Sequence, residues 1–196
     1  EQILAGAILE AEAAGGVSTP ATQDAAWVTS KDHPWRRAAG DGRVRDGDLV
    51  VLSAGVLADG YVAEVVRTVH VGEPTEAIKS LYRRRDDLWD RLVDACRPGR
   101  PTSALLDAYQ QAGEQLPAMP VAHGLGLGFD PPVVSASLRA TAEADFLEEG
   151  MVLAVTGYVW EAGVGAVFTR DAVVIGSDGP EVLTQALSAS GLATTG

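Results

Sequence analysis

The chain has 196 residues, 46% of them hydrophobic and 21% charged, which is ordinary for one globular domain with a sizeable core. Its 27 acidic and 15 basic residues give a formal net charge of −12, which argues against nucleic acid or an anionic membrane as a partner. Its one cysteine, Cys96, excludes an internal disulfide, and no apolar run is long enough to cross a membrane, so we expect a cytoplasmic protein.

The first half of the chain predicts a helix followed by a β-hairpin. Apolar residues recur at helical spacing from Ile3 onward, and Gly15-Gly16 ends that helix. Residues 17–48 are polar and turn-rich, so we expect loop there with at most one short strand. Two β-branched runs, 49–56 and 61–71, are separated by LADG, which is typical of a hairpin.

The second half predicts two helices followed by another hairpin. A long amphipathic helix begins near Thr75 and ends before Pro98-Gly99, and Thr102 or Ser103 caps the next one. A glycine-rich stretch leads to two further strands, 151–160 and 166–175. The order helix, hairpin, two helices, hairpin indicates an α+β fold with a possible internal pseudo-repeat.

Three stretches carry a resemblance to a known family. They are GDLVVLSAGVLADGYVAEVVRTVHVGEPTE at 47–76, AHGLGLGFDPP at 122–132, and EEGMVLAVTGYVWEAGVGAVFTRDAVVI at 148–175. Their order and separations resemble those of the M24 metallopeptidases, the group of creatinase, aminopeptidase P and prolidase. A single glycine motif is a weak signal, whereas three in register over most of the chain are a strong one.

The resemblance implies the "pita-bread" fold, a curved antiparallel sheet with two hairpins, flanked by helices and divided into pseudo-two-fold halves. We expect one such domain over 1–196, lacking the family's first helix and without a separate N-terminal domain. Homodimers are common in the family, so the resemblance leaves this assembly open for the chain.

The family's two-metal site falls on residues that suit metals poorly. Family enzymes hold two divalent cations with two Asp, one His and two Glu, because hard cations need several anionic oxygen ligands. Carried over in order, these positions fall on Ser53, Glu64, His123, Thr156 and Arg170. Only His123 is retained and Glu64 is a conservative change, whereas the fixed positive charge of Arg170 would repel a metal. We therefore expect no metal and no cofactor.

Two further family positions are also changed. Asp130 stands where the family has His-Glu, and Trp35 falls on the histidine that metal-independent creatinase uses as its acid–base. The candidate substrate-binding residues are accordingly Ser53, Thr156, Asp130 and Trp35. The candidate catalytic residues, if any chemistry remains, are His123, Glu64 and Arg170.

The charges of Glu64 and Arg170 lead to a structural hypothesis for the altered site. A buried Glu64 without metals needs a counter-charge, because an isolated buried carboxylate is unstable. Arg170, on the neighbouring hairpin, is placed to supply it. We predict a Glu64–Arg170 ion pair in the vacated site, with His123, Ser53 and Thr156 around it.

Three functions remain open at this point. The favoured one is a non-catalytic pseudo-peptidase whose cleft binds a peptide, a small molecule or a partner chain. The alternative is a metal-independent, creatinase-like hydrolase or lyase acting on a small carboxylate-bearing substrate, with His123 as acid–base and Arg170 as carboxylate anchor. A working Xaa-Pro metallopeptidase ranks last, because of Arg170.

Overall fold

The computed structural model describes residues 1–17, 19–21 and 25–184, so positions 18 and 22–24 of the predicted loop lie outside the described residues. The helices are α1 (Gln2–Ala14), α2 (Glu76–Ala95), α3 (Ala104–Ala112) and α4 (Arg139–Ala144), with a 3-10 turn η1 (Ala136–Leu138). The strands are β1 (Ala26–Val28), β2 (Leu49–Ala58), β3 (Tyr61–His70), β4 (Ala122–Leu125), β5 (Phe129–Val134), β6 (Val152–Glu161), β7 (Gly165–Gly176) and β8 (Gly179–Val182).

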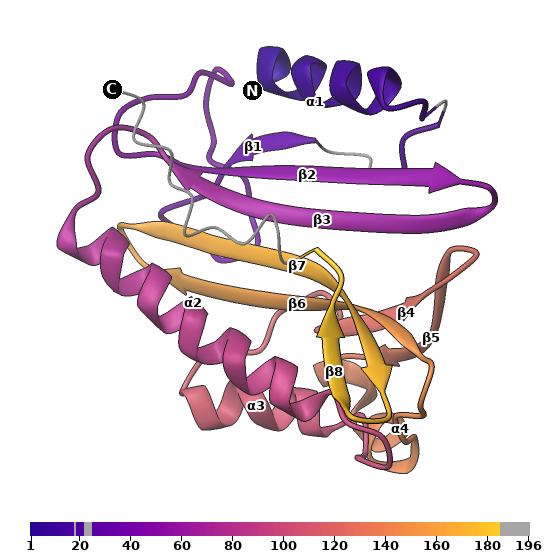
Figure 1. Cartoon of the computed structure of the whole chain (residues 1–196). Helices are drawn as coiled ribbons and strands as arrows, with labels where there is room; N and C mark the ends of the chain where they lie inside the picture. Colours follow the sequence, from indigo (N-terminus) through magenta and orange to yellow (C-terminus); the bar gives the residue numbers. More distant parts are fainter. Residues whose placement is uncertain (18, 22–24, 185–196) are drawn as a thin grey trace.

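The strands form one antiparallel sheet in the order β1-β2-β3-β7-β6-β4-β5, with β8 paired to β7. Two long hairpins, β2–β3 and β6–β7, lie side by side at its centre (Figure 1). Helix α2 packs across β6 and β7, and α3 packs on α2. The predicted α+β fold, an antiparallel sheet with two hairpins and flanking helices, is confirmed.

The first hairpin has a tighter turn than the predicted four-residue connection. Ala58 pairs with Tyr61, so that only Asp59 and Gly60 lie between the strands. Both have positive φ, 50° and 88°. That combination defines the type I′ turn, whose twist matches that of the flanking strands and which favours an Asp-Gly sequence.

Helix α2 forms as its sequence predicts. The Thr75 side chain accepts a hydrogen bond from the Ile78 amide at 3.3 Å and so caps the first turn. The apolar stripe that includes Leu81, Leu88 and Leu92 is fully buried against the sheet. Cys96, directly after the helix, is fully buried in the same core, as expected for a structural thiol.

One buried tyrosine of helix α3 is hydrogen-bonded to strand β6. The Tyr109 hydroxyl donates to the carbonyl of Thr156 at 2.8 Å and accepts from the amide of Tyr158 at 3.0 Å. The ring is fully buried, and burial raises the pKa of Tyr109 well above its ordinary value. The contact fixes β6 at the position where Thr156 enters the candidate site.

The glycine-rich stretch at 122–132 differs from the prediction, which placed no strand there. Strands β4 and β5 form a short pair, and β4 also pairs with β6 through His123 and Ala154. Gly124 makes the pairing possible, because a Cβ at this position would lie 2.3 Å from the carbonyl oxygen of Pro131. Long-range pairing with β6 therefore converts a turn-like sequence into strand.

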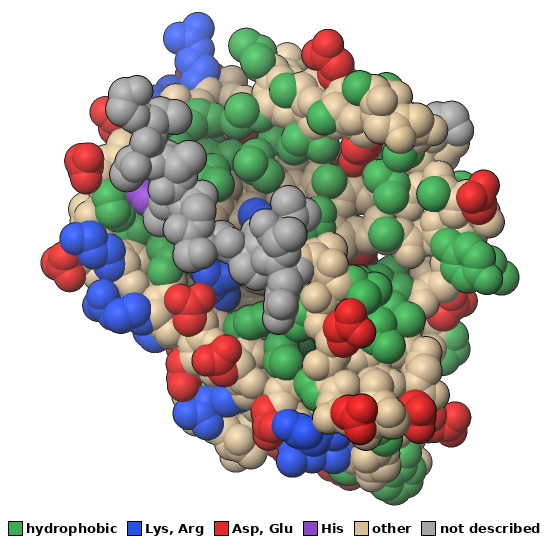
Figure 2. Space-filling model, in the orientation of Figure 1, with side chains coloured by type: hydrophobic (Ala, Val, Ile, Leu, Met, Phe, Trp, Pro, Cys, Tyr) green, Lys and Arg blue, Asp and Glu red, His purple; other side chains and the backbone are tan. Residues whose placement is uncertain are grey.

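Helix α1 forms where predicted, but its apolar residues do not enter the core. None of its residues, all of which are described, is buried. In Figure 2, hydrophobic side chains gather below α1, over β2 and β3, whereas charged side chains lie mainly along the outer and lower edges. Among the described residues, no helix has both the length and the apolar character needed to cross a membrane.

Candidate functional site

Strand alternation places the candidate residues on one face of the sheet. Residues directly opposite each other on paired strands project to the same face. Ser53 pairs with Val66, Val66 with Arg170, and Arg170 with Thr156, so these four form one row across β2, β3, β7 and β6. Glu64 precedes Val66 by two residues on β3 and therefore shares that face.

The predicted ion pair between Glu64 and Arg170 is present. Arg170 Nη1 lies 2.9 Å from Glu64 Oε2, and Arg170 Nε donates to Thr156 Oγ1 at 2.9 Å. The two charged side chains are only 14% and 16% exposed. The guanidinium thus links the first hairpin to the second, at the place where the sheet's halves meet.

The pair extends to His123 on β4. Glu64 Oε1 lies 2.8 Å from His123 Nε2, but outside good hydrogen-bond geometry, and within the described residues this oxygen has no hydrogen-bond partner. His123 Nδ1 is 3.0 Å from the carbonyl oxygen of Gly124. The Phe129 ring stacks on the imidazole, with centroids 3.9 Å apart. His123 is therefore held between a carboxylate and an aromatic ring.

Opposing effects act on the charge of Glu64. Burial raises its pKa, but the contact with His123 and the positive charge of Arg170 more than compensate. The net result is that the pKa of Glu64 lies below its ordinary value of 4.5. Glu64 is consequently a carboxylate at neutral pH, with Arg170 as its counter-charge.

The donor set does not fit a pair of divalent cations. Across the part of the chain that the structure describes, no three His, Cys, Asp or Glu side chains come together as metal ligands. Glu64 and His123 are ligand types, whereas Ser53 and Thr156 are neutral. Arg170 places a permanent positive charge 2.9 Å from Glu64, in the space that a cation would need.

A cavity of about 490 Å³ opens beside the Glu64–Arg170 pair. Two other predicted site residues, Ser53 and Trp35, line this cavity. His123 does not line it and lies behind Glu64. The described residues around it, which we call the cleft, are Ala21, Trp27, Trp35, Arg37, Ser53, Glu64, Val66, Met119, Phe168 and Arg170.

Asp130 and Thr156 differ from their predicted roles as lining residues. Asp130 is on β5 opposite Gly124, and among the described residues it is not part of the cleft wall. Thr156 is fully buried and reaches the cleft only through its bond to Arg170.

The loop between β1 and β2 brings Trp35 to the cleft. The Trp35 amide donates to the Tyr158 hydroxyl at 2.8 Å, and the two rings stack with centroids 3.3 Å apart. Trp35 has φ of 64°, and Thr29 bridges to Arg37 across the base of the loop. Burial raises the pKa of Tyr158, whose hydroxyl accepts this bond.

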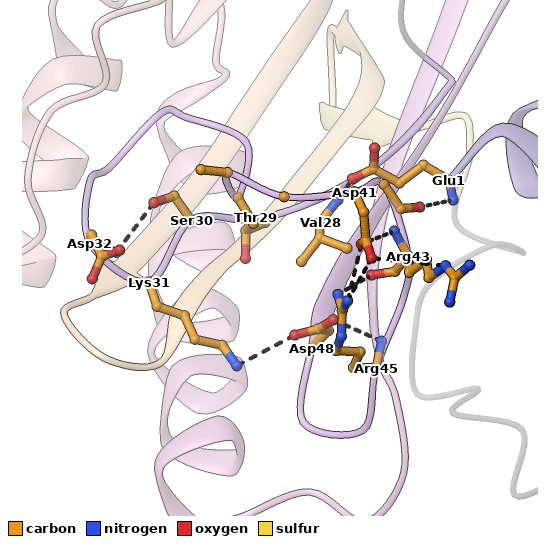
Figure 3. Close-up of a pocket in the computed structure, with 14 residues that line it drawn as sticks. Glu1, Val28, Thr29, Ser30, Lys31, Asp32, Asp41, Arg43, Arg45 and Asp48 are labelled. Atoms are coloured by element: carbon orange, nitrogen blue, oxygen red, sulfur yellow. Dashed lines mark hydrogen bonds and ion pairs between the residues drawn. The ribbon is translucent and has the colours of Figure 1, made fainter.

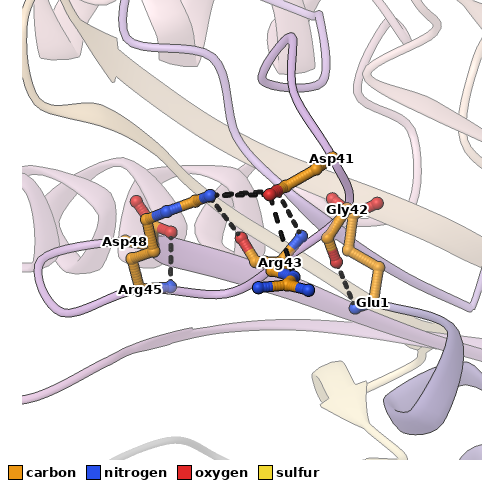
Figure 4. Close-up of polar contacts among 6 residues, drawn as sticks. All are labelled: Glu1, Asp41, Gly42, Arg43, Arg45 and Asp48. Atoms are coloured by element: carbon orange, nitrogen blue, oxygen red, sulfur yellow. Dashed lines mark hydrogen bonds and ion pairs between the residues drawn. The ribbon is translucent and has the colours of Figure 1, made fainter.

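The same loop encloses a second hollow of about 240 Å³ on its other side (Figure 3). Arg45 makes a two-pronged contact with Asp41, and Lys31 reaches Asp48 at 3.4 Å (Figures 3 and 4). Among the described residues, the two hollows share no lining residue. The charges in this hollow are used in holding the loop together, and such exposed pairs add little stability.

Sequence reasoning missed several side chains of the site, among them Met119, Phe129 and the cleft residue Phe168. Met119 lies in an irregular segment, and its Sδ is 3.4 Å from Arg170 Nη2. Phe129 covers His123. No periodicity or motif marks Met119, but Phe129 lies in the glycine-rich stretch beside Asp130, where the resemblance already indicated an altered site.

A comparison of the chain with known protein families identifies the family to which it belongs. The model of metallopeptidase family M24 matches residues 1–177. The chain belongs to metallopeptidase family M24. The M24 motifs recognised in the sequence all lie within that range.

Relatives of this M24 chain are peptidases of similar fold. It is 30% identical over 149 residues to Xaa-Pro dipeptidase of Pyrococcus furiosus, covering 75% of this chain and 42% of the relative. The structure of prolidase from Pyrococcus furiosus matches with a TM-score of 0.79 and 26% identity, over 94% of this chain and 55% of that one. The M24 chain thus spans about half the length of these relatives.

A more distant structure shares the fold alone. Methionine aminopeptidase from Thermotoga maritima has a TM-score of 0.71 at 17% identity, over 92% of this M24 chain and 83% of that chain. The pita-bread architecture predicted from the sequence is therefore confirmed for this M24 member.

Proposed function

We propose that the cleft of this M24 domain is a metal-independent binding site without peptidase activity. The observation that carries the proposal is the position of Arg170, whose guanidinium bonds both Glu64 and Thr156. A cation supplied by the chain balances the carboxylate that would otherwise recruit a metal. Removing the metals without this replacement would leave a buried, uncompensated charge.

The placement of His123 supports binding over acid–base catalysis. A general acid or base must come within hydrogen-bond reach of the substrate. His123 is 5% exposed, its ring is covered by Phe129, and it is separated from the cleft by Glu64. The groups that face the cleft, namely Arg170, Ser53 and the aromatic rings, are suited to holding a ligand.

A peptidase assay with its own control tests this proposal. The purified chain is incubated with an Xaa-Pro dipeptide in the presence of Mn²⁺ or Co²⁺, beside the His123→Ala variant. We expect no metal-dependent hydrolysis in either protein. Metal-stimulated turnover by the wild type that disappears in His123→Ala would overturn the proposal, because a contaminating peptidase would be unaffected by the substitution.

A further inference from the structure

Within the described part of the chain, Arg170 keeps hydrogen-bonding capacity that is not used. Its Nε and Nη1 donate to Thr156 and Glu64, whereas among the described residues Nη2 meets only the thioether of Met119, at 3.4 Å. A thioether sulfur is a weak acceptor, and a guanidinium carries more N–H donors than these contacts occupy. Because Arg170 lines the cleft, the unused donors are available to a ligand there.

Ser53 supplies a second polar group on the same row of the sheet. It lies opposite Val66, which lies opposite Arg170, so Ser53 and Arg170 are two strand spacings apart, about 10 Å between Cα atoms. Within the described residues, the Ser53 hydroxyl has no hydrogen-bond partner, and it lines the cleft. The long Arg170 side chain and the Ser53 hydroxyl can therefore meet one small acceptor group between them.

Three aromatic side chains, Trp27, Trp35 and Phe168, form part of the remaining walls. Trp27 and Phe168 have centroids 6.4 Å apart, and the Arg170 guanidinium carbon is 5.4 Å from the Phe168 centroid. Trp35 closes the cleft from the loop side. The cavity of about 490 Å³ falls in the size range of sites for small organic ligands, and its lining combines apolar side chains with the polar groups of Arg37, Ser53, Glu64 and Arg170.

Charge selects the type of anion. The Glu64 carboxylate already neutralises part of the Arg170 charge, so a dianion beside Glu64 would be repelled more strongly than a monoanion. A carboxylate carries a single charge and matches the planar donor fork of a guanidinium. Arg37, whose guanidinium carbon is 5.5 Å from the Trp27 centroid, is also part of the cleft wall.

We propose that the cleft binds a small monocarboxylic acid with an aromatic or bulky apolar body. Its carboxylate accepts from Arg170 and Ser53, and its body packs among Trp27, Trp35 and Phe168. This proposal rests on the proposed function, because a metal pair bound by Glu64 and His123 would need the space that Arg170 occupies.

Calorimetric titration with three probes tests the proposal: 3-phenylpropionate, its neutral amide, and acetate. We expect the acid to bind at least about tenfold more tightly than the amide, which lacks the charge, and than acetate, which lacks the body. Equal affinity for the acid and the amide would overturn the proposal. This comparison uses the wild-type chain alone and does not depend on the folding of any variant.

Variants identify the groups that hold the carboxylate. Arg170→Lys keeps the counter-charge for Glu64 but loses the donor fork, so we expect about tenfold weaker binding of the acid and an unchanged affinity for the amide. Ser53→Ala should weaken the binding of the acid about threefold. Arg139→Lys, on the exposed surface of α4, is the matched control and should change nothing. Unchanged acid binding in both Arg170→Lys and Ser53→Ala would overturn the assignment.

Titrations in EDTA and in Mn²⁺ separate this inference from the proposed function. Acid binding in EDTA supports both. Binding only in Mn²⁺ would overturn the proposed function, because it would require a metal in the site. Absence of acid binding in either condition, together with absence of Mn²⁺ binding, would overturn the carboxylate proposal and leave the metal-independent site standing.

Discussion

Arg170 on β7 lies 2.9 Å from Glu64 on β3, and this contact spans the boundary between the two hairpins of the sheet. In the M24 family both positions correspond, by resemblance, to metal ligands. Here one keeps its carboxylate while the other carries the opposite charge. The site is therefore neutralised from within the chain, and its stability should depend on the pair.

Removal of Arg170 alone should be costly. Arg170→Met leaves Glu64 nearly buried without its counter-charge, and we expect the free energy of unfolding to fall by about 3 kcal/mol. The double variant Glu64→Gln/Arg170→Met should recover much of this loss, because no uncompensated charge remains. Urea denaturation of the four proteins of this cycle measures both effects.

An exposed pair provides the control for this cycle. Arg139 and Asp107 are 3.2 Å apart but 40% and 46% exposed, so Arg139→Met should change stability by less than about 0.5 kcal/mol. A loss for Arg170→Met as small as that for Arg139→Met would show that Glu64 does not need its partner.

The lowered pKa of Glu64 predicts a defined pH dependence. The charged carboxylate is favoured in the folded state, so its stabilising contribution is complete above the ordinary pKa of 4.5 and is lost as the pH falls through the lower folded-state value. The stability difference between the wild type and Glu64→Gln should accordingly be constant from about pH 8 to 5 and shrink below that. A difference that grows on acidification would contradict this assignment; thermal unfolding at stepwise lower pH measures it.

Tyr158 should control the loop that carries Trp35. Tyr158→Phe removes the hydroxyl that accepts the Trp35 amide, and we expect a loss of about 1 kcal/mol with faster amide exchange in residues 30–38. Tyr61→Phe, at a side chain that is 65% exposed, is the matched control. Equal exchange in the two variants would show that the Tyr158 hydroxyl does not hold the loop.

Cys96 should be inert in the folded protein. It is fully buried, and burial raises the pKa of its thiol to about 12, so almost no thiolate is present near neutral pH. A disulfide reagent at pH 8 should therefore react at least about a hundredfold more slowly with the native chain than with the chain in guanidinium chloride. Rapid stoichiometric labelling of native protein would contradict the buried placement.

The sequence predicts the elements that depend on local pattern. The β-branched runs of β2 and β3 and the apolar stripe of α2 are local signals, and all form as expected. The predicted cap of α3 does not form, because Ser103 at its N-cap position makes no side-chain capping hydrogen bond. Strands β4 and β5 were missed because β4 depends on pairing with β6, which lies more than twenty residues further along the chain, and β5 in turn pairs with β4. Helix α1 was found, but periodicity alone does not reveal that its apolar face stays outside the core.

The part of the candidate site that could be predicted from the sequence is the contact between its two buried charged side chains. The contact of Glu64 with Arg170 follows from the resemblance together with the instability of an unpaired buried carboxylate. Met119 and Phe129 approach the site through irregular segments and a short hairpin, so only the folded chain brings them there. Asp130 lies on β5 opposite Gly124 and is not among the described residues that line the cleft, so its predicted role in substrate binding stays a prediction.

The central claim is that Arg170 takes the place of the metals, and titration with Mn²⁺ tests it most directly. Calorimetry should show no stoichiometric binding to the wild type, whereas Arg170→Glu joins a second carboxylate to Glu64 and His123 and should bind Mn²⁺ at least about tenfold more tightly. Arg139→Glu, which adds the same charge elsewhere, should behave as the wild type. Binding of about two Mn²⁺ per wild-type chain would contradict the claim.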